Sequence, residues 1–229
     1  MKKPMSCSAL ERICAVLSVL IAAGCAAPMR KINVTPLHAD DSSNDLDSYE
    51  RLTDEERGAF TPVAFDEALK LFDESGTGMV VYSADWCPYC QRALPVLADA
   101  ALEAGAPVYY VSLSDGTTTE EQIDTLSRHL DWIEFAVAED DQKEHAVSFQ
   151  IPQVIAVKDG KAINHHVSLF DDLTVSSSDF ELSDEQKVKL KAIYAAMFDA
   201  LRDGAVSTDS APSSSAAEGE ACESANTGC

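Results

Sequence analysis

Residues 79–105 of this chain read MVVYSADWCPYCQRALPVLADAALEAG. The stretch opens with a short apolar run, Met79–Tyr82, which is typical of a buried strand. It continues into WCPYC at residues 86–90 and then into apolar residues at helical spacing that stop at Gly105. The pattern therefore predicts a strand that leads into a Cys-x-x-Cys motif, with the motif at the start of a helix over about residues 88–103.

The placement of the two cysteines predicts redox chemistry. Cys87 lies at the expected helix N-terminus, where unpaired N–H groups and the helix macrodipole favour an anion and lower the pKa of a thiol. Cys90 follows one turn later on the same side of the helix, within disulfide reach. We expect Cys87 to be the nucleophile and Cys90 to be the resolving thiol that releases a mixed disulfide.

Apolar periodicity elsewhere predicts an alternating order of elements. Helices are expected at about residues 65–75, 88–103, 119–130 and 184–201, and strands at about 79–82, 107–113, 154–157 and 163–167. Asp159-Gly160 supplies a hairpin turn between the last two strands. The order α-β-α-β-α-β-β-α predicts an α/β fold in which a central mixed sheet is flanked by helices on both faces.

Several of these features resemble the thioredoxin fold family. Trp86 precedes the Cys-x-x-Cys motif, and Pro95 follows Cys90 at the position where that family has a helix-kinking proline. Ile151-Pro152, ahead of an apolar strand, resembles the family's cis-proline loop. The resemblance covers about residues 61–203 and implies a thioredoxin-like fold.

The resemblance also implies roles for the residues around the motif. Pro152 would be a cis-proline that faces the two cysteines, and Ile151 would pair with substrate backbone. Trp86 and Tyr89 would either contact substrate or pack at the helix start. The sequence departs from the family at Val81, where thioredoxins place a buried aspartate that accepts the proton of the resolving thiol.

The N-terminal residues predict export and lipidation. An uncharged run of 11 residues, from Ile13 to Ala23, follows a basic start and has the length of a signal-peptide core. Residues 22–25 read AAGC and resemble the bacterial lipobox, whose cysteine is acylated. We therefore expect residues 1–24 to be a lipoprotein signal peptide and Cys25 to carry the lipid. An ordinary secretory signal is the alternative.

Composition sets the remaining boundaries. Residues 25–58 are rich in Asp, Ser and Glu and predict a disordered acidic linker, whereas residues 204–229 predict a disordered low-complexity tail. The thioredoxin-like domain would then occupy residues 59–203. The net charge of −22 argues against a nucleic-acid partner, which needs a basic face. No apolar run reaches the roughly 18 residues of a membrane-spanning helix.

The tail carries a second cysteine pair, Cys222 and Cys229. The pair could be a small surface disulfide, two thiols without a role, or an auxiliary dithiol that exchanges with Cys87 and Cys90. A zinc site that uses all four cysteines is disfavoured by the spacing of the tail pair. We expect no metal, and no cofactor other than the redox-active Cys87–Cys90 disulfide.

Together these observations predict a thiol–disulfide oxidoreductase that is lipid-anchored on the extracytoplasmic face of the cell membrane. Its expected partners are protein or peptide thiols and disulfides, the membrane itself and a membrane electron-transfer protein. The sequence leaves the redox direction open between reductase and oxidase or isomerase. The alternative is a non-catalytic peptide-binding lipoprotein in which Cys87 and Cys90 form a permanent structural disulfide.

Overall fold

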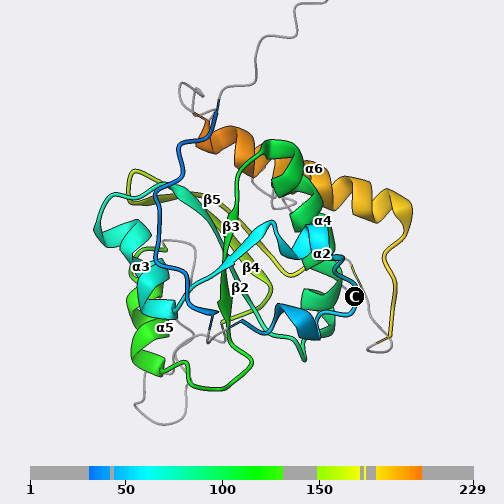
Figure 1. Cartoon of the computed structure of the whole chain (residues 1–229), viewed down its shortest axis with the longest axis horizontal. Helices are drawn as coiled ribbons and strands as arrows, with labels where there is room; N and C mark the ends of the chain where they lie inside the picture. Colours follow the sequence, from blue (N-terminus) through cyan, green and yellow to red (C-terminus); the bar gives the residue numbers. More distant parts are fainter. Residues whose placement is uncertain (1–30, 42–43, 131–148, 171–172, 174–178, 203–229) are drawn as a thin grey trace, which may run out of the picture.

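The computed structural model of the chain describes residues 31–41, 44–130, 149–170, 173 and 179–202 (Figure 1). Its strands are β1 (Phe60–Pro62), β2 (Gly78–Ser83), β3 (Val108–Ser112), β4 (Gln153–Lys158) and β5 (Lys161–Val167). Its helices are η2 (Leu46–Ser48), α2 (Asp54–Arg57), α3 (Phe65–Asp73), α4 (Pro88–Ala104), α5 (Glu120–Ser127) and α6 (Asp184–Leu201). The strands form one five-stranded sheet in the order β1-β3-β2-β4-β5. The predicted α/β fold is therefore confirmed.

The sheet is mixed and has β2 at its centre. β3 pairs in parallel with β1 and with β2, whereas β4 runs antiparallel to both β2 and β5. Side chains alternate along β2, so Met79 and Val81 enter the core on the side of α4 and α6. Val80 and Tyr82 enter the opposite core, which α3 and α5 cover. Figure 1 shows these two helix pairs on opposite sides of the sheet.

Local sequence signals explain where the helices begin and end. Thr119 and Ser183 each form a capping box at the start of α5 and α6, which satisfies N–H groups that the helix leaves unpaired. Gly105 ends α4 in the left-handed conformation, with φ of 66°. Cys87 is the N-cap of α4, and Pro88 is its first residue. The fold therefore places the first cysteine at a helix N-terminus, as predicted.

The turn between β4 and β5 confirms the predicted hairpin. Asp159 and Gly160 both have positive φ, at 51° and 77°, as the tightest hairpin turns require. A Cβ atom on Gly160 would lie 2.7 Å from the backbone oxygen of Phe72. Glycine is therefore required at this position by close packing as well as by conformation.

The strand β1 is absent from the predicted order of elements. It has three residues, and its register pairs Phe60 with Val108 and Pro62 with Tyr110 of β3. Such a short segment shows no alternation of apolar and polar residues, and proline is normally a signal against a strand. The edge position of β1 in the sheet explains why Pro62 is tolerated there.

The prediction of a disordered linker over residues 25–58 is wrong for the residues that the structure describes, 31–41 and 44–58. Ile32, Leu46, Tyr49 and Leu52 are each at most 4% exposed and belong to the core beneath α4 and α6. Complete burial of such a side chain contributes about 1.5–3 kcal/mol. The segment has few apolar residues, but those it has are placed where the domain covers them.

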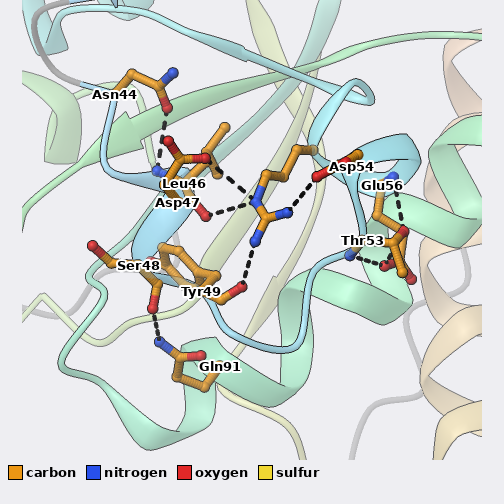
Figure 2. A network of polar contacts seen from close by, with 10 residues as sticks. Asn44, Leu46, Asp47, Ser48, Tyr49, Thr53, Asp54, Glu56 and Gln91 are labelled. Atoms are coloured by element: carbon orange, nitrogen blue, oxygen red, sulfur yellow. Dashed lines mark hydrogen bonds and ion pairs between the residues drawn. The ribbon is translucent and has the colours of Figure 1, made fainter.

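Polar contacts fix this segment as well (Figure 2). The Arg57 guanidinium donates to the backbone oxygens of Leu46 and Tyr49, each at 3.3 Å, and pairs with Asp54 at 3.0 Å. The side chain of Gln91, in α4, donates to the backbone oxygen of Ser48 at 3.4 Å. These bonds hold the turn around η2 against the first turns of α4.

Other predictions concern residues outside the described ranges. The signal peptide, Cys25, the tail residues 204–229 with Cys222 and Cys229, and residues 131–148 of the long segment before Ile151 all lie there. Within the described residues, no helix combines the length and apolar character needed to cross a membrane.

Candidate active site

The two cysteines of the motif occupy the first turn of α4. The Cys87 sulfur accepts a hydrogen bond from the backbone N–H of Cys90 at 3.4 Å. The hydrogen bond from the Cys90 side chain, together with the N–H groups of Cys90 and Tyr89, lowers the pKa of Cys87 from 9.0 to about 7. Burial acts in the opposite direction but is outweighed. Near neutral pH a substantial fraction of Cys87 is therefore thiolate, which is the form that attacks disulfides.

The second thiol has a different environment. Cys90 is completely buried, whereas Cys87 retains 5% exposure. Burial raises the pKa of Cys90, and the neighbouring Cys87 raises it further. Hydrogen bonds from the Ser83 side chain and from the backbone at Ala84 act in the opposite direction. Because Cys90 is buried beneath Cys87, it can act only on the Cys87 sulfur, once that sulfur is joined to a substrate in a mixed disulfide.

The loop before β4 lies opposite the motif. The Ile151–Pro152 peptide bond is cis, as the resemblance to the thioredoxin fold family implied. The Cys87 thiol lies 3.8 Å from the backbone oxygen of Ile151. The antiparallel register of β2 and β4 pairs Tyr82 with Gln153 and so sets the loop beside the end of β2. The structure therefore brings together residues that are more than 60 positions apart in the sequence.

The aromatic residues of the motif differ in exposure. Trp86 is 67% exposed and is the largest exposed apolar side chain beside Cys87 among the described residues. Tyr89 is partly buried and packs on Phe180, with 5.5 Å between the ring centroids. Phe180 is held in place by Arg92, because the Arg92 guanidinium donates to the Phe180 backbone oxygen at 2.7 Å. Trp86 is thus exposed beside Cys87, whereas Tyr89 packs on a neighbouring ring.

Sequence reasoning missed a set of buried polar groups behind Cys90. Ser83, Tyr49 and Tyr110 are fully or almost fully buried, and their hydroxyls form a chain that ends at the carboxylate of Asp45. Val81, which replaces the aspartate of thioredoxins, lies in the same core and offers no polar group. The only available signal was a tyrosine in a segment that composition assigned to a linker.

No metal site competes with this arrangement in the described part of the chain. There, no group of three or more histidine, cysteine or carboxylate side chains is placed to bind a metal ion. Cys87 and Cys90 are free thiols in the structure. Cys222 and Cys229, which a four-cysteine site would need, lie outside the described residues.

A comparison with protein-family models agrees with the fold. A family model described as thioredoxin-like matches residues 77–162, which contain the motif, β2, β3 and the hairpin. Twelve chains of solved structures match. One, whose description proposes an oxidoreductase with a thioredoxin fold, is 13% identical, with a TM-score of 0.37 over 51% of this chain and 88% of that chain. Comparison with curated proteins gives no match. The fold of the described residues is thioredoxin-like over the stretch that this family model matches.

Proposed function

We propose that this protein is a thiol–disulfide oxidoreductase that acts on protein or peptide disulfides. One observation carries the proposal. A thiol whose pKa is lowered to about 7 lies at a helix N-terminus, with a second, buried thiol behind it and the Ile151 backbone oxygen 3.8 Å away. In a permanent structural disulfide, by contrast, neither sulfur has to act as a thiolate nucleophile.

In the reducing direction the reaction has two steps. The Cys87 thiolate attacks one sulfur of the substrate disulfide, forms a mixed disulfide and releases the other sulfur as a thiolate. Cys90 then loses its proton and attacks the Cys87 sulfur, which releases the second substrate sulfur and leaves a Cys87–Cys90 disulfide. A dithiol reductant restores the two thiols. The reverse sequence oxidises a substrate dithiol, and the reduction potential of the pair sets the direction.

The surroundings of Cys87 suggest how a substrate is held. The backbone of Ile151 lies beside the reactive sulfur and can pair with the backbone of an extended peptide. The exposed Trp86 ring offers apolar surface next to it. Substrates would therefore be unfolded or flexible polypeptide segments around a cystine.

We also propose that the protein acts outside the cytoplasm and is held at the membrane by a lipid on Cys25. The support comes from the sequence of residues 1–25. Full-length protein expressed in a bacterium should fractionate with membranes, and Cys25→Ser should move it to the soluble fraction. A Cys25→Ser protein that stays with membranes would show that the anchor lies elsewhere.

The reduction potential of the Cys87–Cys90 pair tests the enzymatic proposal. Thiol tagging across glutathione and dithiothreitol buffers should show a two-electron transition that Cys87→Ser abolishes without loss of fold. A potential near about −270 mV would define a reductase, whereas one above about −180 mV would define an oxidase or isomerase. If the wild-type cysteines keep one redox state in every buffer, the oxidoreductase proposal is wrong, and a peptide-binding role with a fixed motif replaces it.

A further inference from the structure

The resolving step poses a problem for this site. Cys90 must lose a proton to attack the mixed disulfide, and must regain one in the reverse reaction. It is fully buried, and burial raises its pKa. Water therefore has no direct access to the thiol, and the proton needs a path through the protein.

A continuous chain of hydroxyl groups starts at this thiol. The Ser83 side chain, at the end of β2, is close enough to the buried Cys90 thiol to lower its pKa as a hydrogen-bond partner. The Ser83 Oγ atom lies 2.8 Å from the hydroxyl of Tyr49, which lies 3.1 Å from the hydroxyl of Tyr110. Tyr110 donates to the Asp45 carboxylate at 2.5 Å. The three hydroxyls thus connect a buried sulfur to a carboxylate.

The carboxylate is well placed to exchange the proton with solvent. Asp45 is partly exposed and lies at the start of η2. Ser112, at 2.9 Å, and Ser114 both donate to its second oxygen, which leaves the first oxygen to Tyr110. Arg57 fixes the backbone at Leu46 and Tyr49 on the same turn (Figure 2). The packed N-terminal segment therefore supplies two of the four groups in the chain.

We propose that Ser83, Tyr49 and Tyr110 relay the proton of Cys90 to the carboxylate of Asp45. The inference rests on the proposed oxidoreductase function and adds its proton path. When Cys90 attacks, its proton passes to the Ser83 oxygen, the Ser83 proton to Tyr49, the Tyr49 proton to Tyr110 and the Tyr110 proton to Asp45. Each hydroxyl gives one proton and receives one. The Asp45 carboxylate therefore loses its negative charge, and the substrate sulfur that leaves Cys87 carries it away as a thiolate.

The chemistry of the two tyrosines suits this concerted transfer. Burial raises the pKa of Tyr49 and of Tyr110, so neither hydroxyl is a stable anion at neutral pH. Each therefore releases its own proton only while it accepts another. Because a hydroxyl both donates and accepts, the same chain carries a proton back to Cys90 when the disulfide is reduced.

Among the described residues, the other titratable groups near Cys90 do not offer a second path. Cys87 is the sulfur under attack, so it takes no proton in this step. Tyr194 of α6 is buried near Cys90, but its hydroxyl has no hydrogen-bond partner among the described residues. His166 of β5 contacts Tyr194 ring to ring, with 5.7 Å between centroids, rather than through its hydroxyl.

The experiment follows the reaction of the reduced full-length protein with oxidised glutathione by rapid acid quench and mass spectrometry. Formation of the Cys87–glutathione disulfide reports the first step, and its decay to the Cys87–Cys90 disulfide reports the second. The variants are Tyr49→Phe and Asp45→Asn. Tyr82→Phe is the matched control, because Tyr82 is also a buried tyrosine but its hydroxyl has no partner among the described residues.

We expect Tyr49→Phe and Asp45→Asn to form the mixed disulfide at the wild-type rate and to resolve it about tenfold or more slowly near neutral pH. Their resolution rates should rise more steeply than the wild-type rate from about pH 6 to about pH 9, because hydroxide must replace the internal acceptor. Tyr82→Phe should match the wild type in both steps. Circular dichroism checks that each variant is folded, and the partly exposed Asp45 keeps the test valid if Tyr49→Phe does not fold.

The outcomes separate the two proposals. If the wild type forms no mixed disulfide, the oxidoreductase proposal fails. If the wild type completes both steps and folded Asp45→Asn resolves with an unchanged rate and pH profile, the relay is wrong although the function stands. Equal slowing in Tyr82→Phe and Tyr49→Phe would also overturn the relay, because it would reflect the general loss of a buried hydroxyl.

Discussion

At the scale of single residues, two cysteines three positions apart have opposite properties. Cys87 ends a loop, and its sulfur accepts a hydrogen bond from the Cys90 backbone N–H in the first turn of α4. Cys90 lies inside that turn and points into the core. The same helix start therefore stabilises one thiolate and destabilises the other.

The pH dependence of alkylation measures this asymmetry. In the reduced protein, the rate at which iodoacetamide modifies Cys87 should increase with pH and reach half of its maximum at about pH 7. The hydrogen bond from the Cys90 side chain is the largest cause of the lowered pKa, so Cys90→Ala should raise the midpoint. An unchanged midpoint in Cys90→Ala would mean that the backbone N–H groups alone stabilise the thiolate.

The same shift predicts how stability depends on pH. Folding lowers the pKa of Cys87 from 9.0 to about 7, so between these values the unfolded chain binds the proton that the folded protein has lost. The free energy of unfolding of the reduced protein should therefore rise with pH across this window and fall as the pH drops through about 7. Guanidinium unfolding at several pH values with dithiothreitol present measures this free energy. Cys87→Ser is the control, and its free energy of unfolding should lack the rise between about pH 7 and pH 9.

At the scale of elements, the N-terminal segment is an integral part of the domain. Its apolar residues fill the core beneath α4, and Asp40 donates its backbone N–H to Pro62 of β1 at 2.9 Å. The segment also supplies Tyr49 and Asp45 to the polar chain behind Cys90. A segment that composition assigned to a tether therefore contributes to both the core and the site.

Truncation of one leucine tests this conclusion. Leu46 is 3% exposed, so Leu46→Ala should lower the free energy of unfolding by about 2–4 kcal/mol through lost burial and a residual cavity. Leu102, on α4, is 42% exposed, and Leu102→Ala is the matched control with an expected cost under about 1 kcal/mol. If denaturant unfolding shows the same small loss in the free energy of unfolding for Leu46→Ala and Leu102→Ala, the segment does not pack stably on the domain.

At the scale of the whole molecule, charge is the dominant property. Asp and Glu total 39 against 17 Lys and Arg. The resulting negative field attracts cationic polypeptides and repels anionic ones, and salt screens both effects. Clients of the proposed oxidoreductase should therefore be basic or neutral around their disulfides.

Two cystine peptides of equal length, one cationic and one anionic, test this preference. Exchange with the cationic peptide should be the faster at low ionic strength, and should slow as salt rises from about 0.05 M to about 0.5 M. The rate for the anionic peptide should rise over the same range. Rates that are independent of salt for both peptides would show that net charge has no part in client choice.

The sequence alone determined the features that depend on neighbouring residues. The motif at a helix start and the hairpin at Asp159-Gly160 are readable from local pattern, whereas the proline loop at Ile151-Pro152 was implied by the resemblance to the thioredoxin fold family; each is present in the structure. Periodicity likewise predicted β2 and α4, because an apolar face repeats at the period of the element that buries it.

Only the tertiary structure decided which residues gather behind Cys90. Asp45, Tyr49, Ser83 and Tyr110 come from the N-terminal segment, β2 and β3, and sheet pairing and packing bring them together. No local pattern encodes such contacts, because a hydroxyl or a carboxylate is equally compatible with a solvated loop. The N-terminal segment was misassigned for the same reason: average composition describes a segment by itself, whereas its order depends on the surface that the rest of the domain offers it.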